Sequence, residues 1–237
     1  MALALHVCDR ALDAARAAAR FIAAQAQQAV AARGRFLLAV SGGRTPWLML
    51  DALATLDLPW SATHLFQVDE RMALAGSDER NLTHIRSHLL QRVPIPAAQV
   101  HALPVEAADL DAATLSYAAT LTALAGEPPA LDLVHLGLGA DGHTASLVPG
   151  DAALDLTDRY VAVTAEYKGR RRMTLTFPAI DRSRRRLWLV TGADKAPMLA
   201  RLAAADLLIP AGRVARIDTT IVADSAAAGL LARAPGG

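Results

Sequence analysis

The chain has a single cysteine, Cys8, among 237 residues, and only 4% of its residues are aromatic. One thiol excludes an intramolecular disulfide framework and a metal site built from cysteines alone, and it suits a reducing compartment. No stretch approaches the roughly 18 apolar residues that a membrane helix requires. The amino terminus lacks the basic segment and apolar run of a secretory signal. We therefore expect a cytoplasmic protein with no membrane partner.

An excess of charge of either sign is also missing. The chain has 24 Lys and Arg against 23 Asp and Glu, a formal net charge of +1. This balance creates no overall field that would attract nucleic acid or a membrane surface. We expect a small-molecule substrate, and any anion must be bound by a local cluster of charges.

Strand-like and helix-like segments alternate along the chain. Residues 9–33 are rich in strong helix formers and end at Gly34, which suits a left-handed cap. The alternation predicts one α/β domain over residues 1–237, with a mostly parallel sheet covered on both faces. Strands are expected at 35–40, 63–68, 131–137, 160–165, 172–177, 186–192 and 219–224, and further helices at 46–56, 82–93, 109–125, 194–205 and 225–233.

Ligands of open parallel sheets bind beyond the carboxyl ends of the strands, so the loops after the strands are candidate sites. The first such loop is "SGGRTP", residues 41–46. Its small residues open a helix whose unpaired N–H groups can hold an anion. A tight turn with Thr45 as N-cap and Pro46 at the first helical position explains it equally well. The loop lacks the G-K-[ST] ending of a nucleotide-binding P-loop.

The second loop, residues 69–80, is expected to be irregular and is followed by a helix capped by Asn81. Asp69 and Arg71 stand two apart at the end of a strand, so both can point into one cleft. Solvated surface charge is the alternative explanation of such a run. We interpret residues 78–80, "DER", as solvated surface charge.

The third loop, "GLGADGHTAS" at 137–146, matches the dinucleotide fingerprint G-x-G-x-x-G. A dinucleotide loop leads directly into a helix after its third glycine. Here Gly142 leads into "HTASLVPG", which Pro149 and Gly150 interrupt. The sequence therefore argues against a nucleotide cofactor.

The other interpretation of this loop is catalytic. Glycine lets a ligand approach the backbone while Asp141 and His143 face it. A histidine can take a proton from water near neutral pH, and an adjacent carboxylate can fix its tautomer. A structural role in the loop is the alternative for His143. The remaining histidines are assigned to packing or surface: His6, His64, His84, His88, His101 and His135.

Together these stretches resemble the 6-phosphogluconolactonases, within the superfamily that also holds glucosamine-6-phosphate deaminases. The resemblance implies a Rossmann-like three-layer α/β/α fold. It also implies hydrolysis of 6-phospho-D-glucono-1,5-lactone to 6-phosphogluconate, in the oxidative pentose phosphate pathway, without metal or organic cofactor. The subunit is expected to be a monomer or a homodimer. The stretches, in order from about residue 36 to 225, are "SGGRTP", "DER" at 69–71, "GLGADGHTASLVPG", "RMTLTFPAI", "LVTGADKAPML" and "IPAGRV".

The same resemblance implies roles for single residues. His143 would be the catalytic acid/base, oriented by Asp141, and Asp69 and Arg71 would lie beside the substrate. The phosphate would be bound by Arg172, by Lys195 and by the loop Ser41, Gly42, Gly43, Arg44 and Thr45. The sequence departs from the family in "MALAG" after "DER" and in Val148, where the family often has Phe.

Two rival functions remain. Amino-sugar phosphate isomerase/deaminases share the D-G-H motif but carry an acid five positions after its histidine, where this chain has Val148. Sugar-phosphate sensors of the superfamily usually add a DNA-binding helix-turn-helix segment, for which neither end of this chain leaves room. Both features favour the lactonase.

Overall fold

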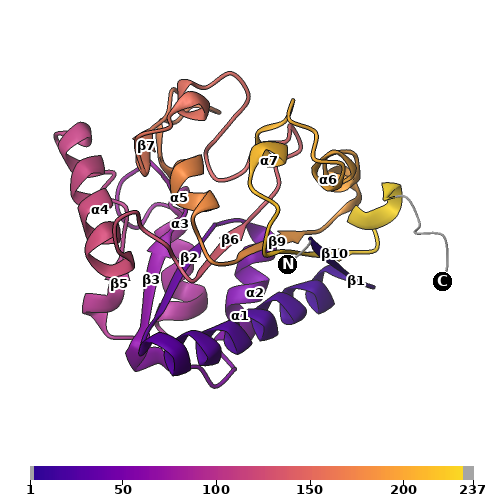
Figure 1. The fold of residues 1–237 in the computed structure, drawn as a ribbon, viewed down its shortest axis with the longest axis horizontal. Coiled ribbons are helices and arrows are strands. Elements are labelled where there is room, and N and C mark those ends of the chain that lie inside the picture. Colours follow the sequence, from indigo (N-terminus) through magenta and orange to yellow (C-terminus); the bar gives the residue numbers. More distant parts are fainter. Residues whose placement is uncertain (1–2, 232–237) are drawn as a thin grey trace.

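A seven-stranded parallel sheet forms the centre of the protein, in a computed structural model that describes residues 3–231 (Figure 1). Within those residues the strand order is β1-β10-β9-β6-β2-β3-β5, and every neighbouring pair is parallel. The bounds are β1 Ala4–Cys8, β2 Phe36–Val40, β3 Thr63–Gln67, β5 Val100–His101, β6 Leu133–Leu136, β9 Arg186–Val190 and β10 Thr219–Asp224.

Helices cover both faces of this sheet. The longest, α1, runs along one side of it (Figure 1), and the α-helices are α1 Ala11–Arg33, α2 Arg44–Leu53, α3 Asn81–Ile85, α4 Leu110–Ala125, α5 Phe177–Asp181, α6 Ala196–Ala203 and α7 Pro210–Arg213. Alternate side chains of β2 show the layering: Leu38 packs with α1 and α2, whereas Leu37 packs with α4. Since successive residues of a strand face opposite sides, both faces of the sheet are buried. The prediction of a three-layer α/β fold is confirmed.

Helix α1 follows directly from its composition. Its buried stripe is almost entirely alanine, which lets the helix pack close to the sheet and costs little side-chain entropy. It ends at Gly34, whose φ of 72° is left-handed and whose N–H donates to Val30 O at 2.8 Å. The predicted cap is confirmed, because glycine adopts this conformation without strain.

A second, antiparallel sheet lies beside the first, and it contradicts part of the sequence prediction. It joins β4 Asp69–Arg71, β8 Arg172–Leu175 and β7 Val161–Val163 in the order β4-β8-β7. The segment after β3 was expected to be irregular, yet pairing with β8 extends it. Hydrophobic patterns indicate a strand but not its partner.

Helix starts also differ from the predictions. Gly43, with a φ of 129°, precedes α2, so Thr45 lies inside the helix and caps nothing. Asn81 is the first residue of α3 instead of its cap, because the carboxylate of Glu70 accepts from the N–H groups of Asn81 and Leu82. Strands β1 and β5 were not predicted. Of the helix expected at 225–233, Ala227–Leu230 form a 3-10 turn and 232–233 lie outside the described residues.

Candidate active site

A cavity of about 210 Å³ opens at the carboxyl ends of β2, β3 and β6. This is the edge at which parallel sheets bind ligands. Its wall is formed by the loops after these strands, by the second sheet and by Lys195, which precedes α6. Its lining residues are Ser41, Gly42, Asp69, Arg71, Gly137, Leu138, Gly139, Ala140, His143, Ala145, Lys168, Arg172 and Lys195.

His143, which lines this cavity, forms a hydrogen-bonded pair with Asp141. Nδ1 of His143 lies 2.5 Å from Oδ1 of Asp141, which also accepts from the backbone N–H of His143 at 3.2 Å. A carboxylate is only an acceptor, so Nδ1 carries the proton and Nε2 is left as the basic nitrogen. The His143 side chain is 21% exposed, open enough for a substrate to reach it.

The glycines of the loop make this pairing possible. A methyl group at Gly139 would lie 2.0 Å from Nδ1 of His143 and 2.6 Å from Oδ1 of Asp141. Gly142 has a φ of 84°, and a methyl group there would lie 2.7 Å from Cβ of Ile209. After Gly142 the chain forms a bridged turn, not a helix. The glycines therefore leave the room that the Asp141–His143 pair and its surroundings need.

Tyr167 completes the surroundings of Asp141. Its hydroxyl donates to Oδ2 of Asp141 at 2.8 Å, so both carboxylate oxygens are engaged. Partial burial raises the pKa of Asp141, but the hydrogen bonds from Tyr167 and His143 outweigh it and lower the pKa to about 2. Asp141 is therefore ionised throughout the neutral range.

Asp69 and Arg71 line the same cavity, as the sequence predicted, and a buried network holds them. Oδ2 of Asp69 accepts from the hydroxyl of Ser146 at 2.7 Å, and its carbonyl accepts from the amide of Asn81 at 2.9 Å. Oδ1 of Asn81 accepts from Arg71 at 2.5 Å. A methyl group at Gly42 would lie 1.9 Å from that same oxygen, so glycine is required here too.

Glu70, between these two residues, is fully buried and anchors the network. Its carboxylate accepts from the N–H groups of Arg71, Asn81 and Leu82 and from the amide of Gln67, and it pairs with Arg80 at 3.2 Å. This satisfies a buried charge. Arg80 is therefore buried, at 4% exposure, and the prediction that it is solvated surface charge is wrong.

Four cations face the cavity: Arg71, Lys168, Arg172 and Lys195. Burial, followed by the neighbouring charge of Arg71, lowers the pKa of Arg172. Like charges held together in a partly desolvated wall are stabilised by a bound anion. The charge pattern therefore suits a phosphorylated or carboxylated ligand.

The loop at 41–45 is divided between two cavities. Ser41 and Gly42 line the His143 cavity, and Gly42, Gly43, Arg44 and Thr45 line an adjoining one of about 370 Å³. Gly42 and Lys195 therefore belong to both cavities. The expectation that the whole loop surrounds one phosphate stays a prediction.

His135 positions this loop through hydrogen bonds with Ser41. It is fully buried in β6, its Nδ1 accepts from the N–H of Ser41 at 3.3 Å, and its carbonyl accepts from the Ser41 hydroxyl at 3.0 Å. Burial lowers its pKa to about 3, so the ring is neutral. The assignment of His135 to packing was incomplete, since the residue also positions the loop.

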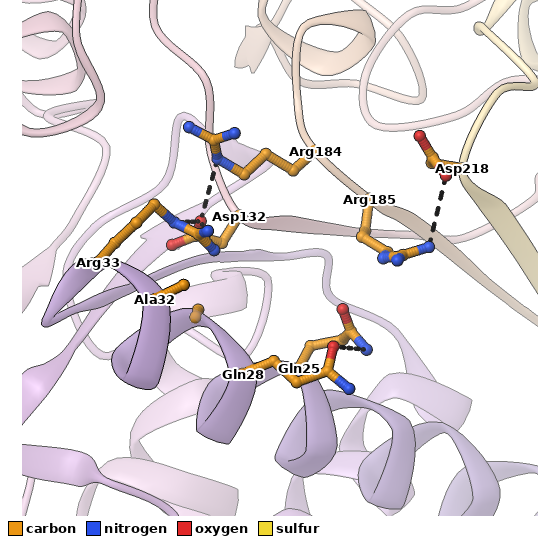
Figure 2. Close-up of a pocket in the computed structure, with 9 residues that line it drawn as sticks. Gln25, Gln28, Ala32, Arg33, Asp132, Arg184, Arg185 and Asp218 are labelled. Carbon is orange, nitrogen blue, oxygen red and sulfur yellow. Dashed lines mark hydrogen bonds and ion pairs between the residues drawn. The ribbon is translucent and has the colours of Figure 1, made fainter. Parts of the chain in front are cut away.

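Another cavity, of about 270 Å³, lies at the opposite, amino-terminal edge of the sheet (Figure 2). Its charges already pair with one another. Asp132 accepts from Arg33 at 2.7 Å and faces Arg184 at 3.4 Å, and Arg185 lies 3.5 Å from Asp218. No histidine lines it, and it is not the candidate active site.

Several residues of the site were missed by sequence reasoning: Tyr167, Lys168, Asn81, Ser146 and Glu70. Lys168 and Tyr167 stand on a hairpin closed by the bridge between Tyr167 and Arg170. The "YKGRR" run contains a glycine between cations. This pattern predicts a turn, but it does not predict which part of the protein the turn contacts. Among residues 3–231 no three His, Cys, Asp or Glu are grouped to hold a metal ion, and no helix is long and apolar enough to cross a membrane.

Comparisons with known proteins agree with the geometry. The family model for glucosamine-6-phosphate isomerases/6-phosphogluconolactonase matches residues 9–222. A 6-phosphogluconolactonase of Mycobacterium tuberculosis is 42% identical over 86% of this chain and 88% of its own, and one of Synechocystis is 40% identical over 74% of each. The solved 6-phosphogluconolactonase of Trypanosoma cruzi is 28% identical, with a TM-score of 0.85 over 97% of each chain.

Proposed function

The chain belongs to the glucosamine-6-phosphate isomerase/6-phosphogluconolactonase family, and from this premise we propose that it hydrolyses 6-phospho-D-glucono-1,5-lactone to 6-phosphogluconate. That reaction is the second step of the oxidative pentose phosphate pathway. The observation that carries the proposal is the Asp141–His143 pair in a cavity lined by four cations. A base and an anion site within one small cavity are what a phosphorylated lactone requires.

His143 acts as the general base and then as the general acid. Nε2 takes a proton from a water molecule whose oxygen attacks the lactone carbonyl carbon. The tetrahedral intermediate then collapses, the bond from carbon to the ring oxygen breaks, and Nε2 returns the proton to that oxygen. Asp141 holds Nδ1–H throughout and stabilises the imidazolium between the two steps. No metal or organic cofactor takes part in this scheme.

The four cations have two proposed roles: one stabilises charge at the reacting carbonyl group, and three bind the phosphate. We assign to Arg71, which donates to Oδ1 of Asn81 at 2.5 Å, the stabilisation of negative charge on the carbonyl oxygen. Arg172, Lys168 and Lys195 bind the phosphate, and each charge-assisted contact contributes about 1.5–3 kcal/mol. This binding energy orients the ring over His143.

Amino-sugar isomerisation and deamination is the rival activity of the family. The deaminases carry an acidic residue five positions after the histidine. In this chain that position is Val148, which is apolar and 6% exposed, so the loop does not supply the acid that the rival activity uses. Asp69, the carboxylate that lines the cavity, accepts a hydrogen bond from Ser146 through Oδ2 at 2.7 Å. We further infer that the enzyme works in the cytoplasm, as a monomer or a homodimer, without nucleic-acid or membrane partners.

The deciding experiment generates the lactone in situ from glucose 6-phosphate with its dehydrogenase. The purified protein is added, and the disappearance of the lactone is compared with spontaneous hydrolysis. Acceleration is the expected result. A rate equal to the spontaneous one, together with turnover of glucosamine 6-phosphate, would assign the rival activity. Binding of the sugar phosphate without turnover of either would identify a sensor.

A further inference from the structure

The hairpin that carries Tyr167 brings a third side chain to the Asp141–His143 pair. Tyr167 and Arg170 form an antiparallel bridge, and Lys168 and Gly169 at the tip have φ values of 53° and 78°. Arg170 forms an ion pair with Glu79 at 2.5 Å, which ties the hairpin to the segment before α3. The hairpin is thereby held over the cavity.

Tyr167 makes three kinds of contact there. Its hydroxyl donates to Asp141 at 2.8 Å, and its ring meets the His143 ring edge to face, with centroids 5.6 Å apart. Lys168 and Arg172 lie over the Tyr167 ring at 5.1 and 5.0 Å. One side chain therefore touches the base, its carboxylate partner and two of the cations that line the cavity.

We propose that Tyr167 is a positioning residue, whose hydroxyl locks Asp141 in the orientation that fits His143 and limits how strongly this carboxylate attracts a proton to the ring. The catalytic consequence rests on the proposed function, but the hydrogen-bonded chain Tyr167–Asp141–His143 does not.

The first part of the proposal follows from the bonding of the carboxylate. Oδ1 of Asp141 serves His143 and Oδ2 serves Tyr167, so rotation about the carboxylate breaks one bond or the other. Asp141 is 37% exposed, and without the hydroxyl its outer oxygen faces solvent. The phenol thus fixes Oδ2 of Asp141, while the ring and backbone N–H of His143 bind Oδ1.

The second part is electrostatic. A hydrogen bond from a neutral phenol spreads part of the carboxylate charge, and this weakens the attraction of Asp141 for an imidazolium. With the hydroxyl in place, a protonated His143 ring is therefore stabilised less than it would be beside a carboxylate that lacked this hydrogen bond. It is the one imidazole in the cavity, whose other charged groups are Asp69, Arg71, Lys168, Arg172 and Lys195.

Tyr167→Phe tests both parts, because it removes the hydroxyl and keeps the ring under Lys168 and Arg172. The pH dependence of kcat/KM and the NMR titration of the His143 ring are measured for this variant and the wild type. We expect the acid limb and the titration midpoint to move to higher pH by about half a unit or more. We also expect kcat to fall several-fold while KM is unchanged. Tyr160→Phe is the matched control, because it also removes a hydroxyl bound to a carboxylate, that of Glu127 at 2.7 Å.

Unchanged kcat and an unchanged titration midpoint in Tyr167→Phe would overturn the proposal. A rise in KM with the acid limb in place would also overturn it, because Tyr167 would then act on substrate binding. The NMR titration needs no substrate. An inactive wild type would therefore refute the lactonase while the Tyr167 chain was still measured.

Discussion

The backbone N–H of Gly139 donates to the carbonyl of His143 at 2.8 Å, and the imidazole occupies the space that a side chain on Gly139 would need. The loop thus folds back on itself, and the missing side chain makes room for the His143 ring. This relationship explains why a glycine pattern that resembles a nucleotide fingerprint surrounds a histidine.

Gly139→Ala is expected to displace His143 from Asp141, because the added methyl group would lie 2.0 Å from Nδ1. Turnover should fall by about 10²-fold or more, the lower range for loss of general acid–base catalysis. Gly229→Ala is the control, since a methyl group there meets no atom within 4 Å. Steady-state rates and circular dichroism spectra of both variants check the prediction. Near wild-type turnover in folded Gly139→Ala would show that the loop tolerates a side chain at this position.

His143→Ala should leave the fold intact and lower turnover by about 10²- to 10⁴-fold, the usual share of a general base. His6→Ala, on the exposed strand β1, should have no effect. Asp141→Asn should cost less, because it removes orientation and charge but leaves the base. Rates corrected for spontaneous hydrolysis are the measurement. If folded His143→Ala kept its turnover, Asp69 would become the leading candidate for the base.

The pH dependence of the wild type should follow the imidazole. With a pKa of about 2, Asp141 stays ionised far below neutral pH, so its protonation cannot produce a fall in rate near pH 6. A protonated imidazole cannot accept water's proton, so kcat/KM should decline in acid as the His143 ring becomes protonated. A rate that stays constant down to pH 4 would contradict this assignment.

The phosphate should be bound in the His143 cavity. Even two of the three proposed charge-assisted contacts contribute about 3–6 kcal/mol, so unphosphorylated gluconolactone should have a kcat/KM at least about 100-fold lower. Arg172→Ala should raise KM strongly, and Arg44→Ala, in the adjoining cavity, should raise it less. Arg20→Ala, on the exposed face of α1, controls for net charge. A larger KM effect for Arg44→Ala would move the phosphate to the adjoining cavity.

His135 should make the fold sensitive to acid. Its pKa is about 3 in the folded protein and near 6.5 when unfolded, so below pH 6.5 the unfolded chain binds a proton that the folded chain does not. Stability should therefore fall as pH drops from 6.5 towards 3, by about 2 kcal/mol between pH 7.5 and 5. In His135→Asn the amide oxygen replaces Nδ1 as acceptor for Ser41 and cannot titrate. His64 and His101, whose pKa values burial also lowers, contribute to the loss in both proteins. Urea unfolding at both pH values should therefore show a larger loss in the wild type than in the variant, by about 2 kcal/mol, and equal losses would contradict the prediction.

Several residues of the site could be predicted from the sequence, because they lie close together along the chain. Asp141 and His143 are two residues apart, and Asp69 and Arg71 follow a strand, so motif and strand-end position were enough to select them. The buried strands followed from hydrophobic pattern, and helix α1 with its Gly34 cap followed from helix propensity. These features depend on neighbours within a few residues.

Other features depend on contacts between distant segments, and only the tertiary structure decided them. The pairing of β4 with β8 turned a presumed loop into a strand, and the hairpin at 167–170 brought Tyr167 to Asp141 across 26 positions. Burial of His135 under Ser41 joins residues 94 positions apart. Long-range pairing depends on the packing of the whole chain, which no local pattern encodes. Sequence alone therefore determined which groups can react, and the fold decided which side chains hold them in place.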